Sequence, residues 1–216
     1  MPEVDELRTP MQARAHKTRA SLVTAAQAEF AERGYASTTA KSIAKRAGVS
    51  TGSFYQYFTD KDGVLRELAN ERAAVLRDTI LREMRADLGP STGLAPDMTR
   101  SAIVARLTGV VDAVVRHHRE DTRFHAVVTE RRLADAELDA AATAGERTLV
   151  ERTAELLQRW GHSGDCLATA FVLFGMVEGS VHAHVLGHPI ISDTRFRDTL
   201  VEAVLRLALP AAPTRV

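Results

Sequence analysis

Hydrophobic residues recur every three or four positions through most of the chain, the period of a helix that buries one face. The first such segment spans about Lys17–Arg33, with Leu22, Ala26 and Phe30 on one face. Gly34 follows, and glycine readily adopts the left-handed conformation that ends many helices. Because strand-like alternation is nearly absent, the pattern predicts an all-α protein.

Two short helices are predicted next, Thr39–Arg46 and Ser50–Tyr57, separated by a turn around Gly48. Each begins at a hydroxyl residue, Thr39 or Ser50, of the kind that accepts a hydrogen bond at a helix N-terminus. Gly48 permits the positive φ that brings the second helix across the first. This is a helix-turn-helix arrangement, whose second helix fits the major groove of DNA.

The rest of the chain predicts six more helices, about nine in all. A long fourth helix starts at Asp60 and runs to about Met84, and a loose connection follows from Leu88 to about Met98. Pro210 ends the last helix. The five later helices cover about 101–120, 121–133, 136–160, 165–186 and 192–209.

The composition fits a folded protein, with 45% hydrophobic and 26% charged residues among 216. The richest apolar stretch, Cys166–Val177, is shorter than the roughly 20 residues of a membrane helix, so no membrane partner is expected. The acidic start of the chain is not a secretory signal. The chain has one cysteine, so it can form no internal disulfide, and a cytoplasmic protein is expected.

Charge is distributed unevenly, although the formal net charge is zero. Residues 11–61 carry eight Lys or Arg against three Asp or Glu, whereas residues 62–216 carry 19 positive and 22 negative side chains. A basic front segment on a mildly acidic body is typical of a DNA-binding module, although chance clustering explains the charges equally well.

The stretch Thr18–Glu67 resembles the N-terminal domain of TetR-family regulators. The matching motifs are Phe-Ala-Glu-Arg-Gly-Tyr, Thr-Thr, Ile-Ala-Lys-Arg-Ala-Gly-Val-Ser, Phe-Tyr-Gln-Tyr-Phe and Lys61. One departure is Ser42, where the family often has an acidic residue that completes a capping box with Thr39, so that extra bond is in question. The resemblance implies a flexible arm at 1–15, a DNA-binding domain at 16–76 with its motif at 39–58, and a regulatory domain at 77–216.

The same resemblance implies double-stranded operator DNA as a partner. Thr51 and Gln56 are the candidates for base contacts, since a glutamine amide can pair with adenine. Tyr55, Tyr57 and Lys61 would bind phosphates, but either tyrosine could belong to the core, and Gln56 and Lys61 could simply face water. The DNA-binding set is Thr39, Lys41, Ser50, Thr51, Gly52, Ser53, Tyr55, Gln56, Tyr57 and Lys61.

In the resembling family the body binds a small-molecule inducer and forms a homodimer through its last two long helices. Small residues on 165–186 and an apolar face on 199–209 are compatible with that interface, and equally with a monomer core. The candidate pocket residues, each of which could also be plain core packing, are Phe124, His125, Val128, Phe171, Phe174, Glu178 and His182.

No catalytic motif occurs in the body, so no enzyme and no cofactor are expected. Glu178 and His182 share a helix face and, with His118 and His125, could hold a transition metal, but packing is favoured and no metal is predicted. The main prediction is a repressor that binds a palindromic operator as a homodimer and is released by an inducer. An activator, a constitutive DNA binder, or a small helical enzyme or binding protein are the alternatives.

Overall fold

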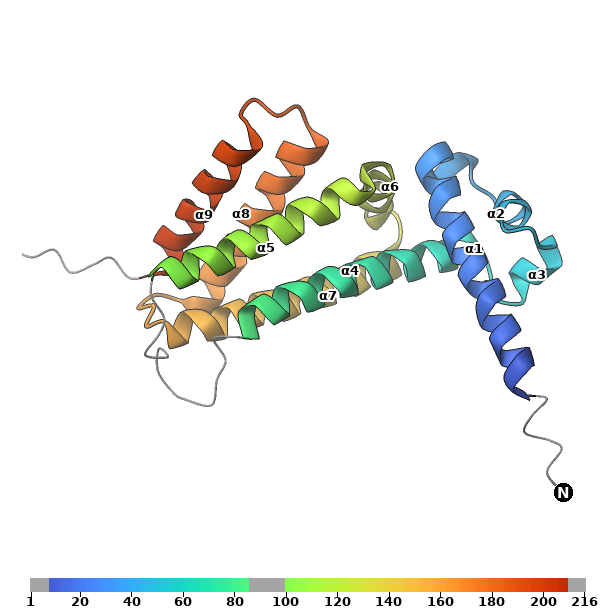
Figure 1. Cartoon of the computed structure of the whole chain (residues 1–216), viewed down its shortest axis with the longest axis horizontal. Coiled ribbons are helices and arrows are strands. Elements are labelled where there is room, and N and C mark those ends of the chain that lie inside the picture. The colour runs from blue at the N-terminus through green and yellow to red at the C-terminus, as the bar shows by residue number, and fades with distance from the viewer. Residues whose placement is uncertain (1–7, 86–99, 210–216) are drawn as a thin grey trace, which may run out of the picture. The chain divides into compact units, whose positions relative to one another are not determined.

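The computed structural model describes residues 8–85 and 100–209. Every regular element in this part of the chain is a helix, which confirms the predicted all-α class (Figure 1). The predicted connection at Leu88–Met98 and the helix end at Pro210 lie outside the described residues, as do residues 1–7 of the predicted arm. The helices are α1 (Arg8–Ser37), α2 (Ala40–Arg46), α3 (Thr51–Tyr55), α4 (Lys61–Arg85), α5 (Arg100–Glu120), α6 (Thr122–Arg132), α7 (Ala136–Arg159), α8 (Cys166–Leu186) and α9 (Asp193–Ala208).

Helix α1 starts at Arg8, earlier than the predicted Lys17, so residues 8–15 are helical rather than part of a flexible arm. Pro10 is compatible with this earlier start, because it falls in the first turn, where a helix tolerates a residue without an amide hydrogen. The helix is interrupted at Gly34, which has φ 70° and ψ 173°, and a short helical segment follows to Ser37, so the predicted stop marks a kink inside α1.

Contacts divide the chain into two compact units. Among the described residues, the first unit comprises 8–71 and 123–139, and the second comprises 72–85, 100–122 and 140–209. Helices α4 and α7 therefore contribute residues to both units, while α6 belongs almost wholly to the first. The sequence pattern placed 77–216 in one domain and gave no sign that 123–139 pack with the N-terminal helices.

The core of the first unit is built from one face of each of its helices. Phe30 of α1 lies 6.5 Å from Phe124 of α6, measured between ring centroids. Both rings are fully or almost fully buried, so α6 closes the same core that α1 organises. The other large members of this core are Leu22, Ile43, Phe54, Phe58, Val64, Leu65, Leu68 and Val127.

In the second unit α5, α8 and α9 pack against one another, and Figure 1 shows them side by side. Their buried side chains include Val111, Val114, Leu173, Leu200 and Val204. Helices α4 and α7 add Ile80 and Leu157 to this core.

Helix α8 has nearly the predicted bounds 165–186, but its apolar character extends beyond Cys166–Val177, so the whole helix is long enough to cross a membrane although that stretch is not. By length and composition alone it could span a membrane, with a mean hydropathy of 1.5 in its best window, of which 17% is buried. Its exposed side chains include Leu167 (55% exposed), Phe171 (68%) and Val172 (56%). Length and composition do not by themselves place a helix in a membrane, but this face needs an apolar partner.

Candidate nucleic-acid interface

Helix α2 begins at a complete capping box. The Thr39 hydroxyl oxygen accepts from the Ser42 amide at 3.1 Å, and the Ser42 hydroxyl oxygen accepts from the Thr39 amide, also at 3.1 Å. The second bond of the capping box, from the Thr39 amide to residue 42, is therefore present although residue 42 is not acidic. The Ser42 hydroxyl reaches the same amide that a carboxylate would. Both orphan amides at this helix start are satisfied.

The turn after α2 depends on Gly48, whose φ is 71°. A residue with a side chain is strained at this angle, as predicted from the sequence. The Val49 amide donates to the Ala44 carbonyl at 3.0 Å and closes the turn. Ile43 and Ala44 are buried beneath it, so the turn is fixed to the core of the first unit.

Helix α3 is shorter than the predicted Ser50–Tyr57. It spans Thr51–Tyr55, with Ser50 as N-cap and Gln56 as C-cap. The Ser50 hydroxyl accepts from the Ser53 amide at 3.0 Å, which confirms Ser50 as the cap. Beyond the helix, the amides of Tyr57 and Phe58 both donate to the Phe54 carbonyl at 3.0 Å, so the chain turns away at Gln56.

One buried ring anchors α3. Phe54 is fully buried and contacts Phe58 at 5.7 Å between centroids. Tyr55 lies at the other side of Phe54, edge to face at 5.4 Å, but is itself 58% exposed. The buried anchor leaves Thr51, Gly52, Tyr55 and Gln56 exposed, and we call these four residues the recognition surface.

The remaining predicted contact residues differ in exposure. Thr39, Lys41 and Ser50 are exposed, whereas Ser53 is half-buried. Tyr57 is also half-buried and packs against the core of the first unit, whereas its contact with a phosphate stays a prediction.

Lys61 is engaged by the protein itself. Its ammonium donates to the carbonyls of Tyr35 at 2.7 Å and Thr38 at 3.0 Å, at the end of α1. It also lies 3.9 Å from the centroid of the Tyr35 ring. Burial lowers the pKa of Lys61, although the Asp62 carboxylate opposes this shift. An ammonium has three donors, and two of those of Lys61 serve these carbonyls.

Tyr35 is a structural residue that the sequence analysis did not single out. Its hydroxyl donates to the Asp62 carboxylate, and its ring carries Arg131 of α6 at 3.9 Å from the centroid. Burial and then the hydrogen bond to Asp62 raise the pKa of Tyr35 to about 12. The residues around Lys61 are thus held by contacts between α1, α4 and α6.

Arg46 is one of the eight positive side chains of residues 11–61, but its charge is paired with two carboxylates. Its guanidinium donates to Glu29 at 3.0 Å and to Glu32 at 2.7 Å. Hydrogen bonds to Glu32 and then Glu29 raise the pKa of Arg46 above its usual range. Lys41 and Lys45, by contrast, are exposed on the same helix.

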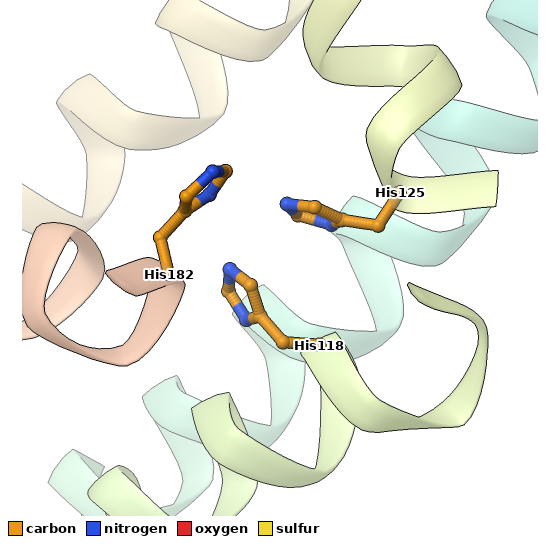
Figure 2. Close-up of side chains that lie close together, drawn as sticks. All are labelled: His118, His125 and His182. Atoms are coloured by element: carbon orange, nitrogen blue, oxygen red, sulfur yellow. The ribbon is translucent and has the colours of Figure 1, made fainter. Parts of the chain in front are cut away.

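The predicted pocket residues occupy several environments. In the first unit Phe124 is core, and Val128 packs beside it while His125 is half-buried. In the second unit Phe174 packs against the core, but Phe171 is 68% exposed. His182 lies close to His118 of α5 (Figure 2). Glu178 also lies close to His118, with its Oε1 3.2 Å from His118 Nε2.

Two family models match the chain. The model described as "Bacterial regulatory proteins, tetR family" matches residues 22–68, which include the capped α2 and α3. The model described as "Tetracyclin repressor-like, C-terminal domain" matches residues 103–207. The chain belongs to the TetR family. The family is one of bacterial regulatory proteins with an N-terminal helix-turn-helix domain, and it is not a family of enzymes.

A curated relative supports the assignment of the chain to the TetR family. The transcriptional regulator BetI of Burkholderia thailandensis is 36% identical over 116 residues, which are 54% of this chain and 51% of BetI. The chain therefore spans about half the length of the relatives it matches.

Solved structures show the same fold. A protein of Mesorhizobium loti assigned to the TetR family superposes with a TM-score of 0.71 at 19% identity, covering 90% of this chain and 96% of that one. SmeT of Stenotrophomonas maltophilia, the repressor of a multidrug efflux pump, superposes with a TM-score of 0.64 at 22% identity, covering 88% and 91%.

Proposed function

We propose that this regulator binds a palindromic operator as a homodimer, represses transcription, and is released from DNA by a small-molecule inducer. The observation that carries the proposal is the exposed recognition surface on a capped, core-anchored helix. Such a helix enters the major groove with little conformational freedom to lose. Thr51 and Gln56 are the proposed base contacts, with Gln56 suited to adenine.

Phosphate contacts would fix the register of the recognition surface on DNA. Tyr55, Tyr57 and the third donor of Lys61 are the proposed phosphate ligands on one side of it. Thr39, Lys41, Ser50 and Ser53 add hydroxyl and ammonium donors around the helix starts. Lys41 is exposed, and no Asp or Glu lies between residues 33 and 59 to repel the DNA backbone.

A homodimer is supported by the apolar face of α8. Phe171 and Val172 are exposed, and a side chain added at Gly175 or Gly179 would meet nothing within 4 Å. Small residues next to large exposed ones permit a close helix–helix contact with a second copy. On α9 the exposed Leu207 extends this apolar surface, whereas Leu200, Val204 and Leu205 are used within the chain's own core.

Release by an inducer is supported by the place of α6. This helix follows α5 of the second unit, yet Phe124 and Val127 are part of the core that also holds Phe54. A ligand that shifts α6 would therefore act on the core beneath the recognition surface. The ligand would change the equilibrium between a DNA-binding and a non-binding arrangement of the protein, without covering the DNA-binding surface. This function suits a cytoplasmic protein.

Selection of bound duplexes from a random pool tests the proposal. We expect enrichment of one palindrome whose half-sites lie about 34–36 Å apart, one helical turn. A double variant, Thr51→Ala with Gln56→Ala, should enrich no sequence while keeping the wild-type helical content. Equal binding of every duplex by the wild-type protein would overturn the proposal.

A further inference from the structure

His118 of α5 has an oxygen atom close to each of its ring nitrogens. The ring is fully buried, with Nδ1 2.9 Å from the carbonyl oxygen of Val114 and Nε2 3.2 Å from Oε1 of Glu178. A neutral imidazole has a single N–H and can serve only one of these oxygens. The site therefore calls for a second positive centre between His118 and Glu178, either a proton or a metal ion.

His182 brings another imidazole to the same place. It lies four residues after Glu178 on α8, so the two side chains leave the helix on one face. Its ring centroid is 6.1 Å from that of His118, and potential ligand nitrogens of the two rings lie within 4.8 Å of one another. Figure 2 shows the two side chains pointing toward one another; His125, also drawn there, belongs to the first unit.

We propose that His118 Nε2, a Glu178 carboxylate oxygen and a nitrogen of His182 bind a divalent transition-metal ion of the Zn²⁺ type. This inference deepens the proposed function and rests on it, because it names the class of effector that the regulator would sense. Two imidazoles and one carboxylate form a ligand set typical of zinc, and a water molecule completes a tetrahedron. Such a set also binds Co²⁺ and Ni²⁺.

The surroundings of the three ligands favour a metal ion. The Val114 carbonyl accepts the Nδ1 proton of His118, which directs the lone pair of Nε2 toward Glu178, the arrangement seen around metal-bound histidines. The ligands come from α5 and α8, which pack against each other within the second unit. Glu178 keeps 38% of its side chain exposed, so an ion has a path from solvent.

Titration of the metal-free full-length protein with Co²⁺ tests the site directly. We expect visible ligand-field absorption that saturates at one ion per chain and is displaced by Zn²⁺. Glu178→Gln, which keeps the shape of the side chain, and His182→Ala should each weaken binding about 10-fold or more. His188→Ala, at an exposed histidine outside the site, is the matched control and should bind like the wild type.

The contrary results are equally specific. Absence of ligand-field bands, or equal Co²⁺ affinity in wild type and Glu178→Gln, would overturn the metal site and leave an imidazolium–carboxylate pair in its place. Circular dichroism of each variant shows whether it is folded, and Glu178→Gln, at a partly exposed position, carries the test if His182→Ala does not fold.

A DNA-binding measurement separates this inference from the proposed function. Zn²⁺ should change the affinity for a selected operator by about 5-fold or more in the wild type and not in Glu178→Gln. Metal binding without any operator binding would overturn the proposed function while supporting the site. Operator binding without metal binding would overturn the site alone.

Discussion

The guanidinium of Arg66 in α4 donates through Nε to both carboxylate oxygens of Asp135, at 2.9 and 3.2 Å. Asp135 is almost completely buried just before α7, and its Oδ1 also accepts from the Leu138 amide at 3.0 Å. One carboxylate thus caps α7 and ties the α6–α7 junction to α4 within the first unit.

Replacement of Asp135 should destabilise the first unit. Asp135→Asn removes the charge from a buried, hydrogen-bonded pair, and we expect a loss of about 1–3 kcal/mol in the free energy of unfolding by urea. Asp139→Asn is the matched control, because Asp139 pairs with Arg132 at the surface, and its effect should stay within about 0.5 kcal/mol. Equal losses in the two variants would contradict the role given to Asp135.

The same contact makes stability depend on pH. Burial raises the pKa of Asp135. Hydrogen bonds from the Leu138 amide and then Arg66 lower this pKa by more than burial raises it, so the net shift is downward. The unfolded state therefore takes up the proton at a higher pH than the folded state, and stability is lost as pH falls below the usual carboxyl range. The stability difference between wild type and Asp135→Asn should shrink over that interval in urea titrations at stepped pH.

Two glycines of the helix-turn-helix should respond in opposite directions to alanine. Gly48→Ala places a Cβ in open space but at a φ of 71°, so we expect a loss of about 1–2 kcal/mol from backbone strain alone. In α3, Gly52 has ordinary helical backbone, and its added Cβ would lie 3.7 Å from the Ser50 hydroxyl. Gly52→Ala should therefore raise stability by up to about 1 kcal/mol. Urea unfolding that ranks the two in reverse would refute this account of the turn.

The apolar face of α8 should govern the oligomeric state. Gly175→Glu fits the single chain, since nothing lies within 4 Å of its Cβ, but it places a charge where a second copy would pack. We expect sedimentation velocity to show a dimer for the wild type and a monomer for this variant. Val75→Glu replaces an equally exposed residue of α4 and should remain dimeric. A monomeric wild type would exclude the proposed interface.

Asp193 at the start of α9 should titrate unusually low. Its Oδ1 accepts from Arg119 at 2.7 Å and from His184 Nε2 at 2.8 Å. The Arg119 bond and then the His184 bond lower the pKa of Asp193 to about 2. Its contribution to stability is therefore present above the usual aspartate range and is lost as pH falls toward about 2. Carboxyl carbon NMR should report this pKa, and Arg119→Gln should raise it whereas Arg116→Gln should not.

Local signals in the sequence were sufficient for the helix-turn-helix. Hydroxyl residues at 39 and 50 and the glycines at 34 and 48 act on their immediate neighbours, so the caps and turns could be read from sequence alone. The sequence predicts that α3 ends at Tyr57, two residues beyond its actual end at Tyr55, because Phe54 and Phe58 keep the helical spacing of apolar residues across the turn that follows α3.

Long-range pairings could not be predicted in this way. Arg46 counts as a free charge in the sequence but is held by Glu29 and Glu32, and Lys61 is held by two carbonyls of α1. Likewise, the spacing of apolar residues over 123–132 predicts a helix with one apolar face. It does not indicate that this face packs in the core of the first unit. Such partners depend on how distant helices pack, and no local pattern encodes that.

Quantitative binding to every single-base-pair variant of a selected operator tests the central claim most directly. Gln56→Ala should lose about 1–3 kcal/mol at one symmetric pair of positions, where discrimination between bases should disappear, with affinity for unrelated DNA unchanged. Gln158→Ala, at an exposed glutamine of α7, should reproduce the wild-type profile. A Gln56→Ala profile identical to the wild type at every position would show that the recognition surface does not read bases through Gln56, and the same result for Thr51→Ala would contradict the account.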